Sequence, residues 1–214
     1  MMQSLRRVFM LACLLLLGAC ASPTISADYR PPPDKQVGLA AGSMTYTHQG
    51  NYYRVFVRKV DSAERFRFEV TDGAIKTIGG WLSSEGPELG VRGQPFVTEL
   101  PAGDYEITGW GAGFGATRGV VELVVGIPFT VESGKTIYLG NFHFAGRWMP
   151  FGIGSMSVTL KSEGARDIPV ITKQFPALAI VPLRTTVAPG IQLRLVGGYG
   201  QITDPPRIYE PMRP

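Results

Sequence analysis

The chain has 214 residues, with 21 Lys and Arg against 17 Asp and Glu; 44% of its residues are hydrophobic and 18% are charged. This balance excludes a charge-rich disordered tail and a multispan membrane protein. The 27 glycines and 17 prolines exceed average usage, and no collagen period accompanies them. The composition therefore predicts one folded domain with many turns.

The first residues combine a positive start with a short apolar run. Arg6 and Arg7 precede the apolar stretch 8–17. Such a run is too short to cross a bilayer, because a spanning helix needs roughly 20 residues. The pattern therefore predicts a secretory signal. One alternative is an ordinary secretory signal in which Cys20 has no role of its own. Cys13 shows that a cysteine without such a role can occur here, inside the apolar run.

Residues 17–20, Leu-Gly-Ala-Cys, resemble the lipobox of bacterial lipoproteins. In that family a dedicated peptidase cuts before a cysteine whose thiol carries a diacylglycerol. The resemblance implies a signal peptide at 1–19 and lipidation of Cys20. It also implies the outer membrane, with the domain facing the periplasm, because Ala21 stands where an Asp commonly retains such proteins in the inner membrane.

Cleavage and lipidation would change the charge and thiol counts. Loss of Arg6 and Arg7 would lower the formal net charge from +4 to +2, which argues against nucleic acid as a partner. Cys13 would leave with the signal and Cys20 would be blocked. The mature chain would then hold no free thiol and no internal disulfide, which excludes a cysteine nucleophile.

The remaining chain divides by composition into a tether, a domain and a tail. Residues 20–35 are rich in Ala, Ser, Thr and Pro, so we expect a flexible tether rather than a first strand packed on the domain. Residues 36–203 are expected to form a single β-sandwich domain. Residues 204–214 form a Pro-rich C-terminal tail.

Alternation of apolar and polar residues predicts strands through most of the domain. In residues 65–71, Phe66, Phe68 and Val70 alternate with charged or polar residues, and this is the clearest case. The other predicted strands are 53–57, 75–78, 96–100, 104–108, 120–125, 136–144 and 155–161, with edge strands at 180–181 and 191–196. Many short strands separated by turns indicate a mainly β fold, an antiparallel sandwich.

Two segments carry turn residues that predict hairpins. In residues 96–107, Pro101 presets a type I turn and Gly103 supplies a positive φ; in residues 129–139, Gly134 takes the equivalent place. These Leu-Pro-x-Gly-x-Tyr and Gly-Lys-x-x-Tyr-Leu patterns resemble strand pairs of transthyretin-like and carboxypeptidase-regulatory-like sandwiches. The resemblance covers 95–144 and implies a transthyretin-like or Ig-like sandwich.

One short helix is expected near the C-terminus. Asp167 is placed to cap a helix that begins near Pro169 and ends before Pro176. An acidic residue, a short helix and a Phe-Pro pair in this order also resemble the ends of some uncharacterised β-rich bacterial lipoproteins.

The sequence carries only weak motifs for nucleotide binding, metal binding or catalysis. The Gly-x-Gly-x-x-Ala pattern in 109–116 precedes a predicted strand, whereas a nucleotide site requires a helix there, so no cofactor is expected. His48 and His143 are the only histidines, and no metal site is expected. No Gly-x-Ser-x-Gly elbow occurs. A carboxylate pair including Asp104 or Glu106 would define the alternative of an envelope hydrolase.

Aromatic residues gather in Gly-rich segments, which we expect to be loops. Rings in such loops can stack on sugars or anchor a protein partner, although they can also plug the ends of a sandwich. The candidate binding residues are Trp81, Trp110, Phe114, Trp148, Met149 and Phe151. Residues 109–119 and 145–154 form the best candidate surface.

The sequence thus leads to a non-enzymatic binding or scaffolding module of the bacterial envelope. It would be anchored in the membrane through the lipid on Cys20. Its partner would be an envelope protein or a cell-wall polymer. The alternatives are the carboxylate hydrolase and a purely structural lipoprotein.

Overall fold

The computed structural model of the chain describes residues 25, 29, 32, 35–47, 50, 52–71, 89–114, 117–149, 152–176, 178 and 192–195. For some strand residues, among them Phe114, Trp148 and Met149, only the backbone is described. The elements are β1 Val37–Tyr46, β2 Tyr52–Lys59, β3 Arg65–Thr71, β4 Gly93–Pro101, β5 Gly103–Phe114, β6 Thr117–Val131, β7 Thr136–Met149, β8 Gly152–Lys161, α2 Gly164–Gln174 and β9 Gln192–Leu195.

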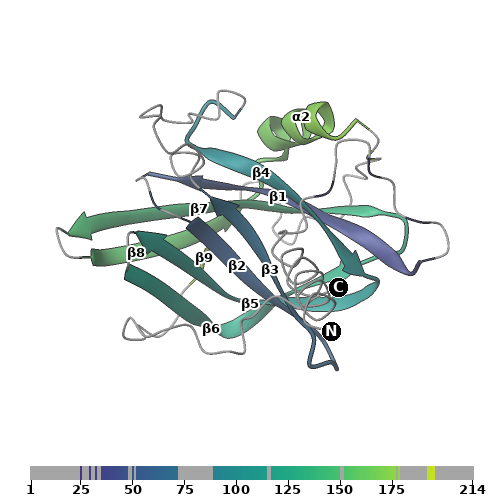
Figure 1. Cartoon of the computed structure of the whole chain (residues 1–214), viewed down its shortest axis with the longest axis horizontal. Helices are drawn as coiled ribbons and strands as arrows, with labels where there is room; N and C mark the ends of the chain where they lie inside the picture. Colours follow the sequence, from purple (N-terminus) through teal and green to yellow (C-terminus); the bar gives the residue numbers. More distant parts are fainter. Residues whose placement is uncertain are drawn as a thin grey trace, which may run out of the picture.

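The strands form two sheets that pack face to face (Figure 1). One sheet has five strands in the order β4-β1-β7-β8-β9, and the other has four in the order β3-β2-β5-β6. This confirms the expected mainly β sandwich with a short helix near the C-terminus. One pair departs from the antiparallel expectation, because β1 and β7 run parallel.

The inward faces of the two sheets share one core of aromatic and aliphatic side chains. Phe68 of the four-stranded sheet stacks on Phe96 of the five-stranded sheet, with ring centroids 4.9 Å apart. Tyr105 and Phe129 stack within the four-stranded sheet at 5.4 Å. Burial of these large apolar surfaces is the main force that holds the sheets together.

Strand β1 is buried along almost its whole length. Its inward residues Ala40 and Met44 join the main core, while Leu39 and Ala41 face outward into a second cluster beneath α2. A strand covered on both faces shows no clean alternation of apolar and polar residues. The sequence pattern therefore did not predict β1.

The two predicted hairpins are wrong, because each turn carries the chain from one sheet to the other. β4 pairs with β1 whereas β5 pairs with β2 and β6; likewise, β6 and β7 belong to different sheets. The positive φ expected of the two glycines is confirmed, since Gly103 has φ 147° and Gly134 has φ 70°. Each pair of strands faces the same core from opposite sides, and a local turn motif does not reveal this.

Two Gly-rich segments that were expected to be loops are instead ends of hairpins. β5 extends to Phe114 and β6 begins at Thr117, while β7 extends to Met149 and β8 begins at Gly152. The predicted strand 65–71 coincides with β3. The predicted strands at 75–78 and 180–181 lie outside the described residues.

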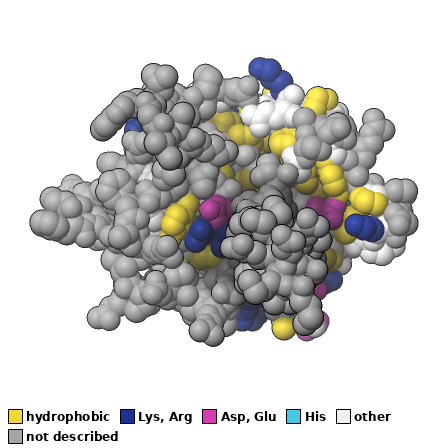
Figure 2. Space-filling view, in the orientation of Figure 1, with side chains coloured by type: hydrophobic (Ala, Val, Ile, Leu, Met, Phe, Trp, Pro, Cys, Tyr) yellow, Lys and Arg dark blue, Asp and Glu magenta, His cyan; other side chains and the backbone are white. Residues whose placement is uncertain are grey.

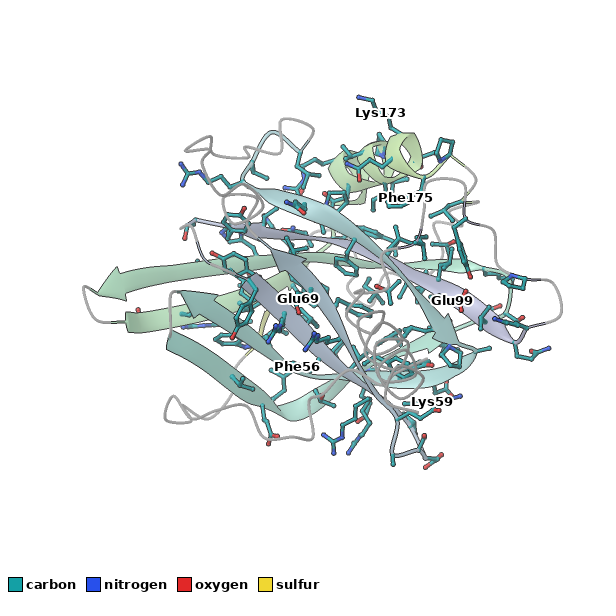
Figure 3. The ribbon with its side chains drawn as sticks, in the orientation of Figure 1. Phe56, Lys59, Glu69, Glu99, Lys173 and Phe175 are labelled. Atoms are coloured by element: carbon teal, nitrogen blue, oxygen red, sulfur yellow. The ribbon has the colours of Figure 1, made fainter. Side chains whose placement is uncertain are left out.

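Helix α2 covers the outer face of the five-stranded sheet, above β4 and β1 (Figure 1). Ile171 is buried on its inner side, and Phe175 packs against the same second cluster. Figure 3 shows Lys173 projecting away from the sheets. Asp167 does not cap the helix: the N-cap is Glu163, and the Asp167 side chain is buried inside the first turn.

The segment expected to be a flexible tether is partly docked. Ile25 and Tyr29 are partly buried against the second cluster, which includes Leu39 and Tyr138. These two positions of the predicted tether therefore contact the domain. Two apolar side chains can add buried area to such a cluster even in a segment poor in apolar residues.

Candidate functional site

The two Gly-rich hairpins project from the same end of the sandwich. Residues 47–51 connect the end of β1 to the start of β2, so Tyr46 and Tyr52 lie at one end. Tyr46 pairs with Phe144 of β7, and Tyr52 pairs with Gly113 of β5. Both hairpins continue beyond these pairs, and their tips point to the left of Figure 1. We call this the hairpin end.

An aromatic cluster closes the core just below the hairpin end. The rings of Tyr46 and Tyr53 stack at 4.5 Å, and Tyr53 lies 4.9 Å from Phe144. Trp110 meets Phe144 edge to face at 6.2 Å. Because these rings come from both sheets, the base of the hairpin end is held by the core.

The position of Trp110 differs from the prediction that this residue lies in a loop. It lies in the middle of β5 rather than in a loop, its ring is 5% exposed, and its Nε1 donates a 3.2 Å hydrogen bond to the carbonyl oxygen of Leu195. The ring faces inward because a bulge between Ile107 and Gly109 shifts the alternation along β5, so that Trp110 points to the core as Ile107 does. Trp110 is thus a core residue that also ties β5 to β9.

The other candidate residues divide into two groups. The backbone of Phe114 lies at the tip of one hairpin, and that of Trp148 and Met149 at the tip of the other. The structure therefore brings these three positions to one end. Trp81, Phe151 and Cys20 lie outside the described residues.

A buried carboxylate organises a polar cluster beneath α2. Oδ2 of Asp167 accepts hydrogen bonds of 2.6 Å from the hydroxyls of both Ser43 and Tyr138. Oδ1 accepts a 2.7 Å bond from Nε of Arg166. Burial, and then the nearby Asp167 carboxylate, raise the pKa of Tyr138, so the phenol stays protonated and donates.

The hydrogen bonds continue along the outer faces of β1 and β7. Nδ2 of Asn141 donates to Oγ of Ser43 at 2.7 Å and to Oγ1 of Thr45 at 3.1 Å. Oγ1 of Thr45 lies 2.9 Å from Nδ1 of His143. The polar network thus runs from Tyr138 on one side of Asp167 to His143 on the other.

A bulge in β7 makes this network possible. Ala41 pairs with Tyr138, but Gly42 pairs with Gly140, so Leu139 is an extra residue. Tyr138 and Asn141 consequently face outward on the same side, although they are three residues apart. Without the bulge, strict alternation would point the side chain of either Tyr138 or Asn141 into the core.

The network fixes the helix on the sheet rather than forming an open reactive centre. Ser43, Asn141 and Asp167 are each fully buried. The Ser43 hydroxyl already donates to a carboxylate and has no surface toward a substrate. Buried polar groups that satisfy one another in this way specify one packing arrangement.

The carboxylates considered for hydrolysis lie on the outer face of the four-stranded sheet. Oδ1 of Asp104 accepts a 2.7 Å hydrogen bond from the Thr130 hydroxyl, and Glu106 forms a 2.9 Å ion pair with Arg58. Both contacts are exposed. The two acids are therefore engaged by cross-strand partners on an open sheet face.

The same face carries charges of both signs. Glu69 pairs with Arg54 at 2.7 Å and with Arg67 at 3.2 Å. Figure 2 shows Lys or Arg beside Asp or Glu on this side of the molecule, interspersed with hydrophobic side chains. The visible described residues thus form no extended field of one sign.

Neither a metal-ligating cluster nor a membrane-spanning helix occurs within the described ranges. Among those residues, no group of three or more His, Cys, Asp or Glu side chains is arranged to hold a metal ion. No helix in the part of the chain that the structure describes has the length and apolarity needed to cross a membrane.

The chain enters the domain at the end opposite the hairpins. The carbonyl oxygen of Gln36 accepts a 2.7 Å hydrogen bond from the amide of Ala102, and that of Val37 accepts one of 2.8 Å from the amide of Gly134. Both turns lie between strands of different sheets. We call this the entry end.

The sequence did not identify the polar network. Ser43, Thr45 and Asn141 are common residue types with no distinctive spacing, and the sequence around Asp167 predicts a helix cap. One signal was available: His143 alternates with Phe142 and Phe144, which places it opposite the core, where it does form a hydrogen bond.

Comparison with known proteins does not show a family. No protein-family model and no curated protein matches the chain. A solved structure of a leucine-rich repeat protein from Bacteroides thetaiotaomicron matches with 15% sequence identity and a TM-score of 0.30. The match covers 50% of this chain and 14% of that one, and it carries no functional argument.

Proposed function

We propose that the chain is a lipid-anchored β-sandwich of the bacterial outer membrane that faces the periplasm and binds an envelope protein or a cell-wall polymer. The hairpin end would be the contact surface, with Phe114, Trp148 and Met149 as its anchors. The observation that carries the proposal is the convergence of two Gly-rich aromatic hairpins at one end of the sandwich. Aromatic side chains on a well-supported base are effective binding anchors.

The position of the chain entry supports this assignment. A lipid on Cys20 would hold the protein near the entry end, because Ile25 packs on the second cluster, whose Leu39 lies beside the 132–135 turn at that end. Along β7, the eleven steps from Tyr138 to Met149 extend about 35 Å at about 3.3 Å per residue. The hairpin end would therefore point away from the membrane and toward partners in the periplasm.

The anchor is tested by Cys20→Ser. The intact chain should label with radioactive palmitate in cells and fractionate with outer membranes. The variant should lose the label and appear in the soluble fraction. Continued labelling, or continued retention in the membrane fraction until detergent is added, would refute the anchor.

A further inference from the structure

Four strands of the five-stranded sheet bring polar residues into one row on its outer face. Thr45 of β1 pairs with His143 of β7, His143 with Thr159 of β8, and Thr159 with Arg194 of β9. Paired residues on neighbouring strands share a face, with Cβ atoms about 5 Å apart. The row thus presents a hydroxyl, an imidazole, a hydroxyl and a guanidinium side by side.

Most of this row lies beyond the helix. α2 packs against β4, β1 and β7, the first three strands of this sheet. His143 and Thr159 are half-buried and Arg194 is exposed. Exposure thus increases along the row from His143 to Arg194, in contrast to the fully buried Ser43 and Asn141 beside it.

The charges around the row favour an anion. Lys161 pairs with Glu163 at 2.7 Å, and Arg166 pairs with Asp167. Arg194 has no carboxylate partner among the described residues, so none of them compensates its positive charge. Arginine presents a planar set of donors that match two oxygens of an oxyanion.

The surroundings of His143 suit its neutral imidazole to donate a hydrogen bond. Its Nδ1 is engaged by Thr45 at 2.9 Å. Burial, and then the charges of Lys161 and Arg166, lower the pKa of His143, which favours the neutral ring. The Thr45 hydroxyl can also donate to Oδ1 of Asn141, at a longer distance of 3.2 Å. When it donates to Nδ1 instead, the ring proton of His143 lies on Nε2 and is available to a ligand.

We infer that His143, Thr159 and Arg194 form a binding site for a phosphate group. A tetrahedral phosphate offers acceptor oxygens in several directions, as donors from three neighbouring strands require. The Arg194 side chain would fold over Thr159 to meet the ligand above β8. This site is separate from the hairpin end, so its test is independent of the proposed function.

The site is tested by titrating the full-length Cys20→Ser chain with inorganic phosphate while recording the imidazole resonances of His143. A saturable shift is expected. Arg194→Glu should weaken phosphate affinity at least tenfold, and Thr159→Val should weaken it several-fold. The matched control is Arg65→Glu, which makes the same charge change on β3 of the other sheet and should leave the affinity unchanged.

A second titration distinguishes a soluble phosphate ester from a lipid headgroup. Glycerol phosphate is compared with vesicles of phosphatidylglycerol, with phosphatidylcholine vesicles as the reference. Arg194-dependent binding to phosphatidylglycerol would assign a headgroup. Binding of glycerol phosphate alone would assign a soluble ester.

The variants are first compared by thermal melting. Arg194 is exposed, so Arg194→Glu should retain the fold. If this variant is less stable, Thr159→Val, which keeps the side-chain shape, decides the question. An absent or linear shift at His143, or equal phosphate affinities for Arg194→Glu and Arg65→Glu, would overturn the proposal.

Discussion

The Ser43 hydroxyl of β1 donates a 2.6 Å hydrogen bond to the Asp167 carboxylate of α2, and 124 positions in the sequence separate the two residues. Both side chains are fully buried. The contact joins the outer face of the five-stranded sheet to the helix that covers it. Docking of α2 therefore depends on a polar contact as well as on the apolar cluster around Ile171.

Asp167→Ala should lower the free energy of unfolding by about 3 kcal/mol, because it leaves the buried hydroxyls of Ser43 and Tyr138 without their acceptor. Urea denaturation measures the change. Asp104→Ala removes an exposed carboxylate and should cost less than about 0.5 kcal/mol. Equal effects of the two substitutions would show that the network does not stabilise the fold.

Gly140→Ala should destabilise the domain by about 3 kcal/mol through the β7 bulge. Gly140 has φ 119°, and an added Cβ would lie 2.8 Å from Cδ1 of Leu160 and 2.9 Å from the carbonyl oxygen of Lys161. Gly134→Ala is the control, because Gly134 also has a positive φ but open space around it. It should cost only about 1 kcal/mol. The difference between the two free energies of unfolding measures the close approach at the bulge.

Stability should fall at alkaline pH because two tyrosines have raised pKa values. Burial, and then the charge of Glu64, raise the pKa of Tyr105 above its ordinary value of 10.0; Tyr138 shifts in the same direction through burial and Asp167. As the pH rises, the two phenols therefore lose their protons at a lower pH in the unfolded chain than in the folded chain. The contribution of the two protonated phenols to the free energy of unfolding is therefore fully present below pH 10. Above pH 10 the free energy of unfolding falls by up to about 1.4 kcal/mol per pH unit for each tyrosine.

Tyr105→Phe isolates one of these contributions. It removes the 2.6 Å hydrogen bond to the carbonyl oxygen of Pro101 and should cost about 1 kcal/mol at pH 7. Urea denaturation between pH 8 and 11.5 should then show a shallower alkaline decline than the unsubstituted chain. An unchanged slope would contradict the assignment of a raised pKa to Tyr105.

Two tryptophans should respond differently to alanine. Trp110→Ala should lower the free energy of unfolding by about 4 kcal/mol, because it empties a core position and removes the bond to Leu195. Trp148→Ala should leave the melting temperature almost unchanged and weaken partner capture. A large loss of stability for Trp148→Ala would instead make that ring part of the core.

Regular alternation made much of the fold predictable. Phe66, Phe68 and Val70 define β3 because one face of that strand is inward and the other carries charge. β1 was missed because Leu39 and Met44 are buried on opposite faces. The pairing of β4 and β5 with different sheets was missed because a turn at Gly103 is compatible with a hairpin and with a crossing between sheets.

The polar network depends on contacts that local patterns do not encode. The bulge at Leu139 changes which residues of β7 face outward, and it brings Tyr138 and Asn141 to the same side. Asp167 is four residues beyond the true N-cap, Glu163. Its partners come from β1 and β7, so only the tertiary structure shows why a carboxylate is buried there.

The most direct test of the proposed binding surface is photo-cross-linking of the intact lipoprotein in living cells from two exposed serines. Ser155 lies near the tip of the β7–β8 hairpin, and Ser133 lies in the turn at the entry end. A photoreactive residue at 155 should yield a discrete adduct that Trp148→Ala diminishes, whereas the same residue at 133 should not yield it. The same adduct from both positions, or from position 133 alone, would contradict the hairpin end as the binding surface.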